Sequence, residues 1–376
     1  MLPVIRVCAM LACMAVLAGC GSRESPLPDD EPEPVLPPEL MLLPASFSDI
    51  VGWRFDDHEA ALETFLISCG AIANRDPAAP LASSAAMGTT GTWHEVCYVA
   101  QAVPPEEARD FFEIWFRPWL ATNNGEELGL FTGYYEPLLN GSRVKNATYH
   151  YPLYRVPPSG EAGHERQAID EGALDGLGLE LLWVDDPVAA FFLHIQGSGR
   201  VRLPDGSTIR VGYAGQNGHA YYAIGRELIA MEEVAREDMS LQAIRDWLHA
   251  NPDRADQVMW TNASYVYFTE LEGPGPLGAQ GVPLTPGRSL AVDKGYLAYG
   301  VPVWLETTLP DGQPWRRLMV AQDTGGAIDG PVRGDIFFGA GELAELLAGH
   351  MAGDGRTWIL LPRLIGTDLI AALDVE

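Results

Sequence analysis

Apolar positions recur at helical spacing in the first third of the chain. Within residues 57–69 they fall on one helix face: Ala61, Leu62, Phe65, Leu66 and Cys69. Residues 104–121 show the same spacing over a longer run: Ala108, Phe111, Phe112, Trp115, Phe116 and Trp119. Pro105 and the two glutamates that follow it are typical of a helix start. The pattern predicts two helices whose aromatic side chains belong to the core.

The spacing changes further along the chain. A helical region in two pieces, broken near Asp238, is predicted over residues 219–251. From about residue 264, short β-branched and aromatic runs alternate with Gly and Pro turns, and we expect no further long helix. These runs are SYVYF, SLAVD, VPVWLETTL, RRLMVAQD, GDIFFG and TWILL. We therefore predict a mainly β (α+β) protein with a β-barrel closed by C-terminal strands.

The first 44 residues differ in composition from the rest. Arg6 precedes an apolar run over residues 7–18, which is too short to span a bilayer of roughly 30 Å and is typical of a secretion signal. The tetrapeptide LAGC, which ends at Cys20, resembles a bacterial lipobox. It predicts a signal over 1–19 and a lipidated Cys20; an ordinary signal cut elsewhere is the alternative. Residues 20–44 are proline-rich and acidic and predict an unfolded tether.

Charge and cysteine content narrow the class of partner and the compartment. The formal net charge of −27 argues against nucleic acid as a partner. Of the five cysteines, Cys8 and Cys13 lie in the predicted signal and Cys20 is the predicted lipidation site. Cys69 and Cys97 remain as an even pair in an exported chain, which predicts a disulfide; two buried free thiols are the alternative.

Familiar catalytic motifs account for little of the sequence. The eight histidines show no HExxH or paired ligand spacing, so we predict no metal and no cofactor. Ser198 lies in IQGSGR, where Gln196 stands in place of the first glycine of a nucleophile elbow. Asp323 begins a D-T-G after an apolar run, as in aspartic proteases, but those enzymes need two such aspartates. The chain holds one D-T-G, so the protease hypothesis is the weaker one.

Three glycine-rich stretches carry aromatic, amide and charged residues. These stretches are FTGYYEP, FFLHIQGSGRVRLPDG and VGYAGQNGHAYYAIGREL. Their candidate binding residues are Tyr134, Glu136, Gln196, Ser198, Arg202, Gln216 and Asn217. Aromatic rings stack on pyranose faces and amides bind hydroxyls, so the set suits a sugar polymer. Taken singly, each residue is equally compatible with turn chemistry.

One carboxylate interrupts the strand-like segment VRGDIFFG, residues 332–339. Burying Asp335 costs several kcal/mol unless it is paired or protonated. Phe337 shares its strand face. Apolar surroundings raise the pKa of a carboxyl group, which is what a general acid requires near neutral pH. Arg333 also shares that face, however, and a structural ion pair is the interpretation that the residues alone favour.

Together these segments closely resemble the membrane-bound lytic murein transglycosylase A (MltA) family. The similarity runs through FTGYYEP, QGSGR, YAGQNGHAY, EDMSLQAIRDWL, ASYVYF and GVPLTPGRSLAVD to QDTGGAIDGPVRGDIFFG, about residues 130–345. The C-terminal part also resembles the three-aspartate (3D) domain, named for Asp293, Asp323 and Asp335. Two differences stand out: Asp329 occupies a position where lysine is usual, and Arg-Gly precedes Asp335.

The resemblance implies a double-psi β-barrel with a smaller β-rich domain inserted in it and a glycan groove between them. The barrel would cover 45–136 plus 265–376, and the insertion 137–264. The implied activity is cleavage of the MurNAc-β-1,4-GlcNAc bond of peptidoglycan to 1,6-anhydro-MurNAc. Asp335 would be the sole catalytic acid and base, and Asp323 and Asp293 would support it.

The implied location is the periplasmic face of the outer membrane of a Gram-negative bacterium, because Gly21 rather than aspartate follows Cys20. Glycan strands of peptidoglycan are the implied binding partner. Cell-wall synthesis or hydrolase complexes are candidate protein partners. The alternative function is a non-catalytic peptidoglycan-binding lipoprotein, since double-psi barrels also occur in wall-binding proteins.

Overall fold

The chain folds as a mixed α/β protein built on two β-sheets. The structure is a computed structural model that describes residues 37–82, 85–273 and 275–363. The described residues from Pro38 onward form one compact unit. The larger sheet consists, in spatial order, of β1 (Leu40–Pro44), β2 (Phe116–Asn123), β14 (Ala352–Pro362), β11 (Pro302–Thr308), β12 (Pro314–Asp323), β10 (Ser289–Val292), β13 (Gly334–Ala340) and β3 (Gly129–Glu136).

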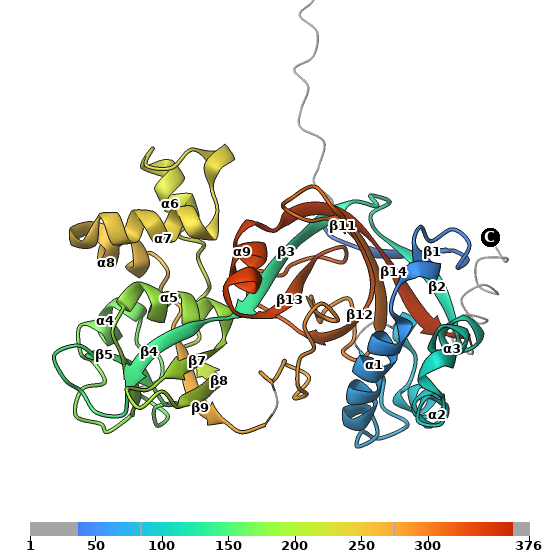
Figure 1. Ribbon diagram of the computed structural model, residues 1–376, viewed down its shortest axis with the longest axis horizontal. Helices are drawn as coiled ribbons and strands as arrows, with labels where there is room; N and C mark the ends of the chain where they lie inside the picture. The colour runs from blue at the N-terminus through green and yellow to red at the C-terminus, as the bar shows by residue number, and fades with distance from the viewer. Residues whose placement is uncertain (1–36, 83–84, 274, 364–376) are drawn as a thin grey trace, which may run out of the picture. The chain divides into compact units, whose positions relative to one another are not determined.

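Six strands of this sheet close into a barrel. Besides its neighbours β2 and β11, β14 also pairs with β3, so the order β14, β11, β12, β10, β13, β3 returns to its start. The pairs β10–β12 and β13–β3 are parallel, and the other pairs of the ring are antiparallel. In Figure 1 the green strand β3 accordingly lies beside the red strand β13. The ring agrees with the predicted barrel of C-terminal strands.

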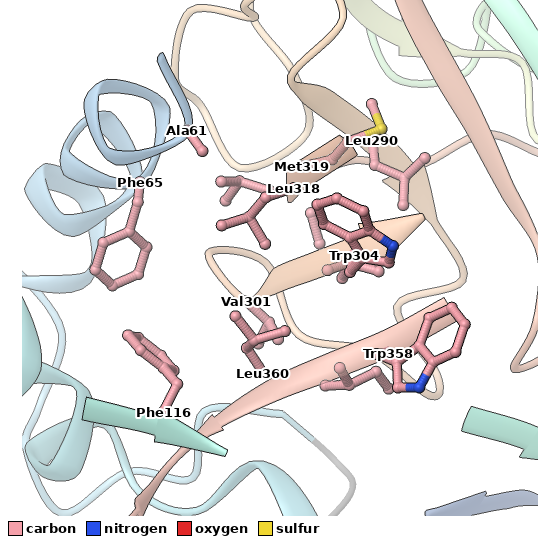
Figure 2. Close-up of a cluster of buried hydrophobic side chains, with 14 of the residues drawn as sticks. Ala61, Phe65, Phe116, Leu290, Val301, Trp304, Leu318, Met319, Trp358 and Leu360 are labelled. Atoms are coloured by element: carbon pink, nitrogen blue, oxygen red, sulfur yellow. The ribbon is translucent and has the colours of Figure 1, made fainter. Parts of the chain in front are cut away.

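Large apolar side chains fill the space between the barrel and the helices that cover it. Trp304 of β11, Leu318 of β12 and Leu360 of β14 are fully buried (Figure 2). Helix α1 (His58–Ile72) brings Phe65 onto Phe116 of β2, with ring centroids 5.7 Å apart. Burial of apolar side chains of this size contributes about 1.5–3 kcal/mol each, so this core positions the strands firmly.

Three helices near the N-terminus and one near the C-terminus flank the barrel. They are α1, α2 (Thr90–Ala100), α3 (Ala108–Trp115) and α9 (Glu342–His350). Asp57 caps α1, because its side chain accepts a hydrogen bond from the amide of Ala60 at 3.1 Å. Helix α9 packs against β3 and β13 (Figure 1). The strand that carries Asp335 is therefore supported by a helix as well as by its sheet neighbours.

A disulfide joins α1 to α2 through Cys69 and Cys97, the two cysteines that the export argument singled out. We expect the double variant Cys69→Ser, Cys97→Ser to lower the free energy of unfolding by about 3 kcal/mol, because cross-linking a 28-residue separation restricts the unfolded chain. Denaturant unfolding of the oxidised protein measures this. Reducing the original protein should give the same loss, and a variant as stable as the oxidised protein would contradict it.

The predicted helix over residues 104–121 ends early. It consists of a 3₁₀ turn (Pro105–Glu107) followed by α3, and the chain is already extended at Phe116. Pro118 disfavours helical backbone at Arg117, and β2 then pairs with both β1 and β14. Phe116 and Trp119 are thus buried from a strand. Their assignment to the core was right, and their assignment to a helix was wrong.

The helix predicted over residues 57–69 is confirmed by α1, and the predicted break near Asp238 lies between two helices, but the start of that second helical region needs correction. The region 219–251 begins its first helix only at α6 (Gly225–Ala230), continues in α7 (Leu241–Ala250), and is followed by α8 (Pro252–Trp260). Helix α5 (Pro187–Gln196), like α2 and α9, was not predicted. The segment PVAAFFLHIQ is apolar on nearly all sides, so it has no helical periodicity. The residues at its two ends indicate the helix instead. The side chain of Asp186 accepts a hydrogen bond from the amide of Val188 at the N-terminus, and Gly197 ends the helix with φ +74°.

The prediction of an unfolded tether over residues 20–44 is wrong at its C-terminal end. Leu40–Pro44 forms strand β1, which pairs antiparallel with β2 from Leu40 opposite Asn123 to Pro44 opposite Trp119. The run LMLLP is apolar enough to form a strand, but the prediction used the composition of the whole proline-rich segment and so missed it. Residues 1–36, which include the predicted signal and Cys20, lie outside the described residues.

The smaller sheet consists, in spatial order, of β5 (Tyr151–Tyr154), β6 (Glu180–Val184), β4 (Leu138–Ser142), β7 (Ser198–Arg202), β8 (Thr208–Gln216) and β9 (Val266–Leu271). It is accompanied by α4 (Arg166–Asp170) and α5–α8, and it has a core of its own around Leu139, Val201 and Phe268. Because β9 pairs with β8, the predicted boundary at 264/265 cuts the last strand off this sheet.

Among the residues that the structure describes, no helix is both long and apolar enough to cross a membrane.

Candidate functional site

Asp335 lies on barrel strand β13, between Thr132 of β3 and Ala291 of β10 in the register. Its side chain is 19% exposed. The Thr132 hydroxyl and the Arg333 guanidinium both donate to the same carboxylate oxygen, Oδ1. Within the described parts of the chain, no group donates to the other oxygen, Oδ2. One oxygen is therefore held in place and the other is available to a ligand.

Glycine allows β3 to approach β13 closely enough for this contact. At Gly129, an added Cβ would lie 1.6 Å from the carbonyl oxygen of Val332, a position that no other residue can occupy without moving the backbone. The parallel register then sets Gly334 against Phe131 and Asp335 against Thr132. The FTGYYEP segment is therefore a wall of the site as well as a source of candidate ligands.

The ion pair proposed as the structural alternative is present. Arg333 is half-buried and contacts Asp335; its guanidinium also donates to the Thr132 hydroxyl at 3.0 Å and to the Gly334 carbonyl at 2.8 Å. These contacts fix the guanidinium on one side of the carboxylate. They also leave Oδ2 unoccupied, so the ion pair orients Asp335 without closing it off.

Asp323, at the end of β12, holds the Tyr134 hydroxyl and two loop amides through its carboxylate. Its Oδ2 accepts from the Tyr134 hydroxyl at 2.9 Å, and its Oδ1 accepts from the backbone amides of Ala279 at 2.8 Å and Thr324 at 2.9 Å. Burial raises the pKa of Asp323 above its ordinary value, and the charge of Asp335 adds to the rise. Burial also raises the pKa of Tyr134 well above its usual range, so the phenol remains a hydrogen-bond donor.

Asp293 connects two loops. Its Oδ1 accepts from the amide of Gly295 at 2.8 Å, and its Oδ2 accepts from the amide of Gly330 at 2.9 Å. Gly330 belongs to the segment that leads from Asp323 into β13. Asp293 therefore stabilises the loop between the other two aspartates, while its own oxygens are both engaged.

Three of the predicted sugar-binding residues lie inside the protein. Glu136 is 1% exposed, and its oxygens accept from Arg200 at 2.6 Å and Arg210 at 2.7 Å. Ser198 is 8% exposed, and the buried amide of Asn217 ties together backbone groups of neighbouring loops. These residues do not present their polar groups to an open surface. Glycine-rich surroundings indicated loops correctly, but they could not tell a ligand from an internal brace.

The other predicted sugar-binding residues, Gln196, Arg202 and Gln216, are more exposed to solvent. Gln196 is half-buried, and its Oε1 accepts from the amide of Tyr135 at 3.0 Å, which joins the end of α5 to β3. Arg202 and Gln216 are exposed on β7 and β8.

A cavity of about 280 Å³ lies where β3 passes into β4, lined by Tyr135, Asn140 and groups of α5, α7 and α9. It offers space for a ligand beside the two sheets.

Sequence reasoning missed Tyr221. This residue is 37% exposed and lies in the loop after β8. It packs close to Gly326, in the barrel loop after Asp323: a Cβ added to Gly326 would lie 3.6 Å from the Cβ of Tyr221. Burial and the nearby charge of Asp335 raise the pKa of Tyr221. A tyrosine from a loop that follows a strand of the smaller sheet thus lies near Asp335. Only its position in the aromatic pair of NGHAYY hinted at this.

Comparison with known proteins decides the family. Residues 130–269 match the MltA specific insert domain, and residues 288–361 match the 3D domain. The crystal structure of MltA from Neisseria gonorrhoeae (monoclinic form) is 32% identical in sequence, with 88% of this chain and 96% of that chain covered and a TM-score of 0.73. The chain belongs to the MltA family. The fold described above is accordingly similar to that of MltA structures.

Other relatives agree. The membrane-bound lytic murein transglycosylase from Agrobacterium tumefaciens is 35% identical, with 87% and 99% of the two chains covered and a TM-score of 0.78. Membrane-bound lytic murein transglycosylase A from Vibrio cholerae is 37% identical over 239 residues, or 61% of this chain. The match spans 65% of the length of that curated MltA relative. A crystal structure of Escherichia coli MltA with bound chitohexaose is 29% identical, with a TM-score of 0.66.

Proposed function

We propose that the protein is a lytic transglycosylase that cleaves the MurNAc-β-1,4-GlcNAc bond of peptidoglycan and leaves a 1,6-anhydro ring on MurNAc. The observation that carries the proposal is the carboxylate of Asp335, with Oδ1 held by Thr132 and Arg333 and Oδ2 without a donor among the described residues. Membership of the MltA family and the bound chitohexaose of the Escherichia coli relative support a glycan substrate.

One carboxyl group is sufficient for this reaction. Asp335 donates a proton to the glycosidic oxygen as the bond from that oxygen to C1 of MurNAc breaks. The resulting carboxylate then takes the proton of the C6 hydroxyl, whose oxygen forms the new bond to C1. Ordinary glycosidases need a second carboxylate to activate water or to form a covalent bond. Here the nucleophile belongs to the same sugar, so its effective concentration is high.

The neighbouring residues have supporting roles in this proposal. Asp323 positions the Tyr134 hydroxyl and the loop that begins at Thr324, and Asp293 holds the far end of that loop. Gln196, Arg202 and Gln216, together with Tyr134, are the proposed substrate contacts. Glu136, Ser198 and Asn217 support the walls from inside.

The finer description of the fold is also a proposal. The closed six-stranded ring supports a double-psi β-barrel, in which β3 and the C-terminal strands form the catalytic domain. The inserted domain would run from Pro137 to about Leu271, where β9 ends. The strand pairing within each sheet supports this division, because β4 pairs with β6 and β7 and not with barrel strands.

Digestion of purified murein sacculi tests the proposed function. The protein should release soluble muropeptides that end in 1,6-anhydro-MurNAc, and mass spectrometry identifies them by the missing water. Retention of the protein on sacculi without release of such products would favour the non-catalytic binding protein instead. Products with a reducing MurNAc end would contradict the transglycosylase reaction and indicate a hydrolase.

We also propose that lipid on Cys20 anchors the protein at the periplasmic face of the outer membrane. The membrane-bound names of the relatives support membrane association. The LAGC segment, with Gly21 after it, motivates the finer assignment. Changing Cys20→Ala should leave the protein without lipid and should remove it from outer-membrane fractions. Unchanged fractionation of the variant would count against the anchor, and Cys8→Ala is the matched control that should fractionate normally.

A further inference from the structure

A second cavity, of about 330 Å³, lies among the elements of the smaller sheet. Strands β5 and β6 and helices α4, α5 and α8 line it, and neither Asp335 nor Asp323 nor Tyr134 contributes to it. It is therefore separate from the candidate active site. Its volume is at the lower end of the range of about 300–1,000 Å³ that ligand-binding cavities occupy.

One wall of this cavity holds a buried cation. Arg166 is 3% exposed; its Nε donates to the Asn262 carbonyl at 3.0 Å and its Nη2 to the Ser264 carbonyl at 2.6 Å, while its Nη1 contacts His194 at 3.2 Å. A guanidinium carries five N–H donors, so two lack an acceptor among the described residues. The rings of Phe191 and Tyr265 lie 4.7 and 5.1 Å from the guanidinium and stabilise its charge. The two remaining N–H donors can bind acceptors that a ligand supplies.

His194 adds no charge to that wall. Arginine cannot accept a hydrogen bond, so Nδ1 of His194 is the acceptor and the ring proton lies on Nε2. Burial and the charge of Arg166 keep the pKa of His194 well below its ordinary value, and the ring stays neutral. The fixed positive charge inside the cavity is therefore that of Arg166.

Lys145, whose ammonium lies 4.7 Å from the centre of the Trp183 ring, is the other cation of the lining.

Carboxylates and indoles form the other walls. Four exposed carboxylates line the cavity: Asp170, Glu171, Asp175 and Asp256. The indole N–H of Trp260 donates to Asp170 at 3.1 Å, and the Tyr154 hydroxyl donates to Asp175 at 3.3 Å. Trp183 and Trp260 are half-buried, so each ring keeps part of its surface free. The cavity thus combines donors on one wall, acceptors on another and flat apolar surfaces between them.

We propose that this cavity is a second carbohydrate site, which binds a neutral N-acetylated hexosamine. An anionic ligand would meet four carboxylates, and a cationic ligand would meet the charges of Arg166 and Lys145. A neutral sugar can donate its hydroxyls to Asp170 and Asp256 and accept from Arg166 through its acetamide carbonyl. Its apolar face can stack on Trp260, as pyranose rings do on aromatic side chains. The class of ligand follows from the cavity; peptidoglycan as its source rests on the proposed function.

Selective labelling of tryptophan with ¹⁵N gives a test that reports on this cavity directly. N,N′-diacetylchitobiose is added to the full-length protein, and the indole N–H resonances are assigned by single Trp→Phe replacements. The resonances of Trp183 and Trp260 should shift in a saturable way. That of Trp93, which is fully buried elsewhere and donates to the Met87 carbonyl, should not shift. The readout needs no turnover, so it is independent of whether the protein cleaves glycan.

Two matched variants on α8 sharpen the test. Asp256→Ala should weaken the affinity measured at the Trp183 resonance about tenfold, because a charge-assisted hydrogen bond is lost. Asp253→Ala, on the same helix but outside the lining, should leave it unchanged. The absence of a saturable shift in the original protein would overturn the proposal. Stronger shifts with glucosamine or glucuronate than with the neutral disaccharide would overturn the assigned ligand class.

Discussion

Replacing Asp335 with Asn should lower the rate of 1,6-anhydro-muropeptide release by at least about 10²- to 10⁴-fold, the usual contribution of a general acid–base residue. The substitution keeps the size of the side chain and removes its titrating proton. Thr132 can still donate to the remaining carbonyl oxygen, so the strand geometry should persist. Retention on sacculi should be preserved, because stacking and amide contacts in the groove do not need this charge.

Two further variants make this result specific. Asp329→Asn, on an exposed part of the preceding loop, is the matched control and should leave the rate unchanged. Asp323→Asn should reduce the rate less, or reduce it through a lower melting temperature, because Asp323 holds the Tyr134 hydroxyl and two backbone amides. If Asp335→Asn kept most of the rate with an intact fold, the proton would come from another group and Asp323 would become the leading candidate.

Glu136→Gln should lower the free energy of unfolding by about 3 kcal/mol, because removing one charge of a buried ion pair leaves its partners uncompensated. Glu136 is 1% exposed and Arg210 is 15% exposed, whereas Arg200 is 39% exposed and keeps contact with solvent, so the loss should lie at the lower end of the range for buried pairs. The residue also ends β3 at the point where the chain enters the smaller sheet. Denaturant unfolding, followed by tryptophan fluorescence, measures the loss.

The control for this prediction is an exposed ion pair of similar geometry. Arg143 and Glu270 contact each other at 2.7 Å, but their side chains are 53% and 36% exposed. Glu270→Gln should therefore cost less than about 1 kcal/mol, as is usual for surface pairs. Equal losses for the two variants would show that Glu136 has no special structural role. It would then return as a candidate sugar ligand.

The sequence predicted secondary structure correctly where apolar side chains alone specify a helix or strand. The run GDIFFG predicted β13, and VPVWLETTL predicted β11, because β-branched and aromatic residues between turn residues have few alternatives to a strand. Aromatic residues of 104–121 were correctly placed in the core. Their secondary structure was not, because Phe116 and Trp119 fit a helical spacing that Pro118 and the pairing with β14 override.

Polar residues were harder to interpret, because a sequence shows which groups need partners but not where the partners lie. Glu136 and Asn217 have the composition of a sugar-binding loop, yet each bonds to groups distant in the sequence: Arg210 is 74 residues from Glu136, and Ala263 is 46 residues from Asn217. Tyr221 shows the opposite case, an exposed ring that only the fold brings near a carboxylate in the other sheet.

The residues alone were sufficient to predict the strand that carries Asp335, the pairing of Cys69 with Cys97, and the family that the chain resembles. Tertiary structure decided what surrounds that carboxylate. Thr132 and Asp335 are 203 residues apart, and they meet because β3 closes the barrel against β13. Strand periodicity fixes which face a side chain points to, but the neighbour it finds there depends on ring closure, which no local pattern encodes.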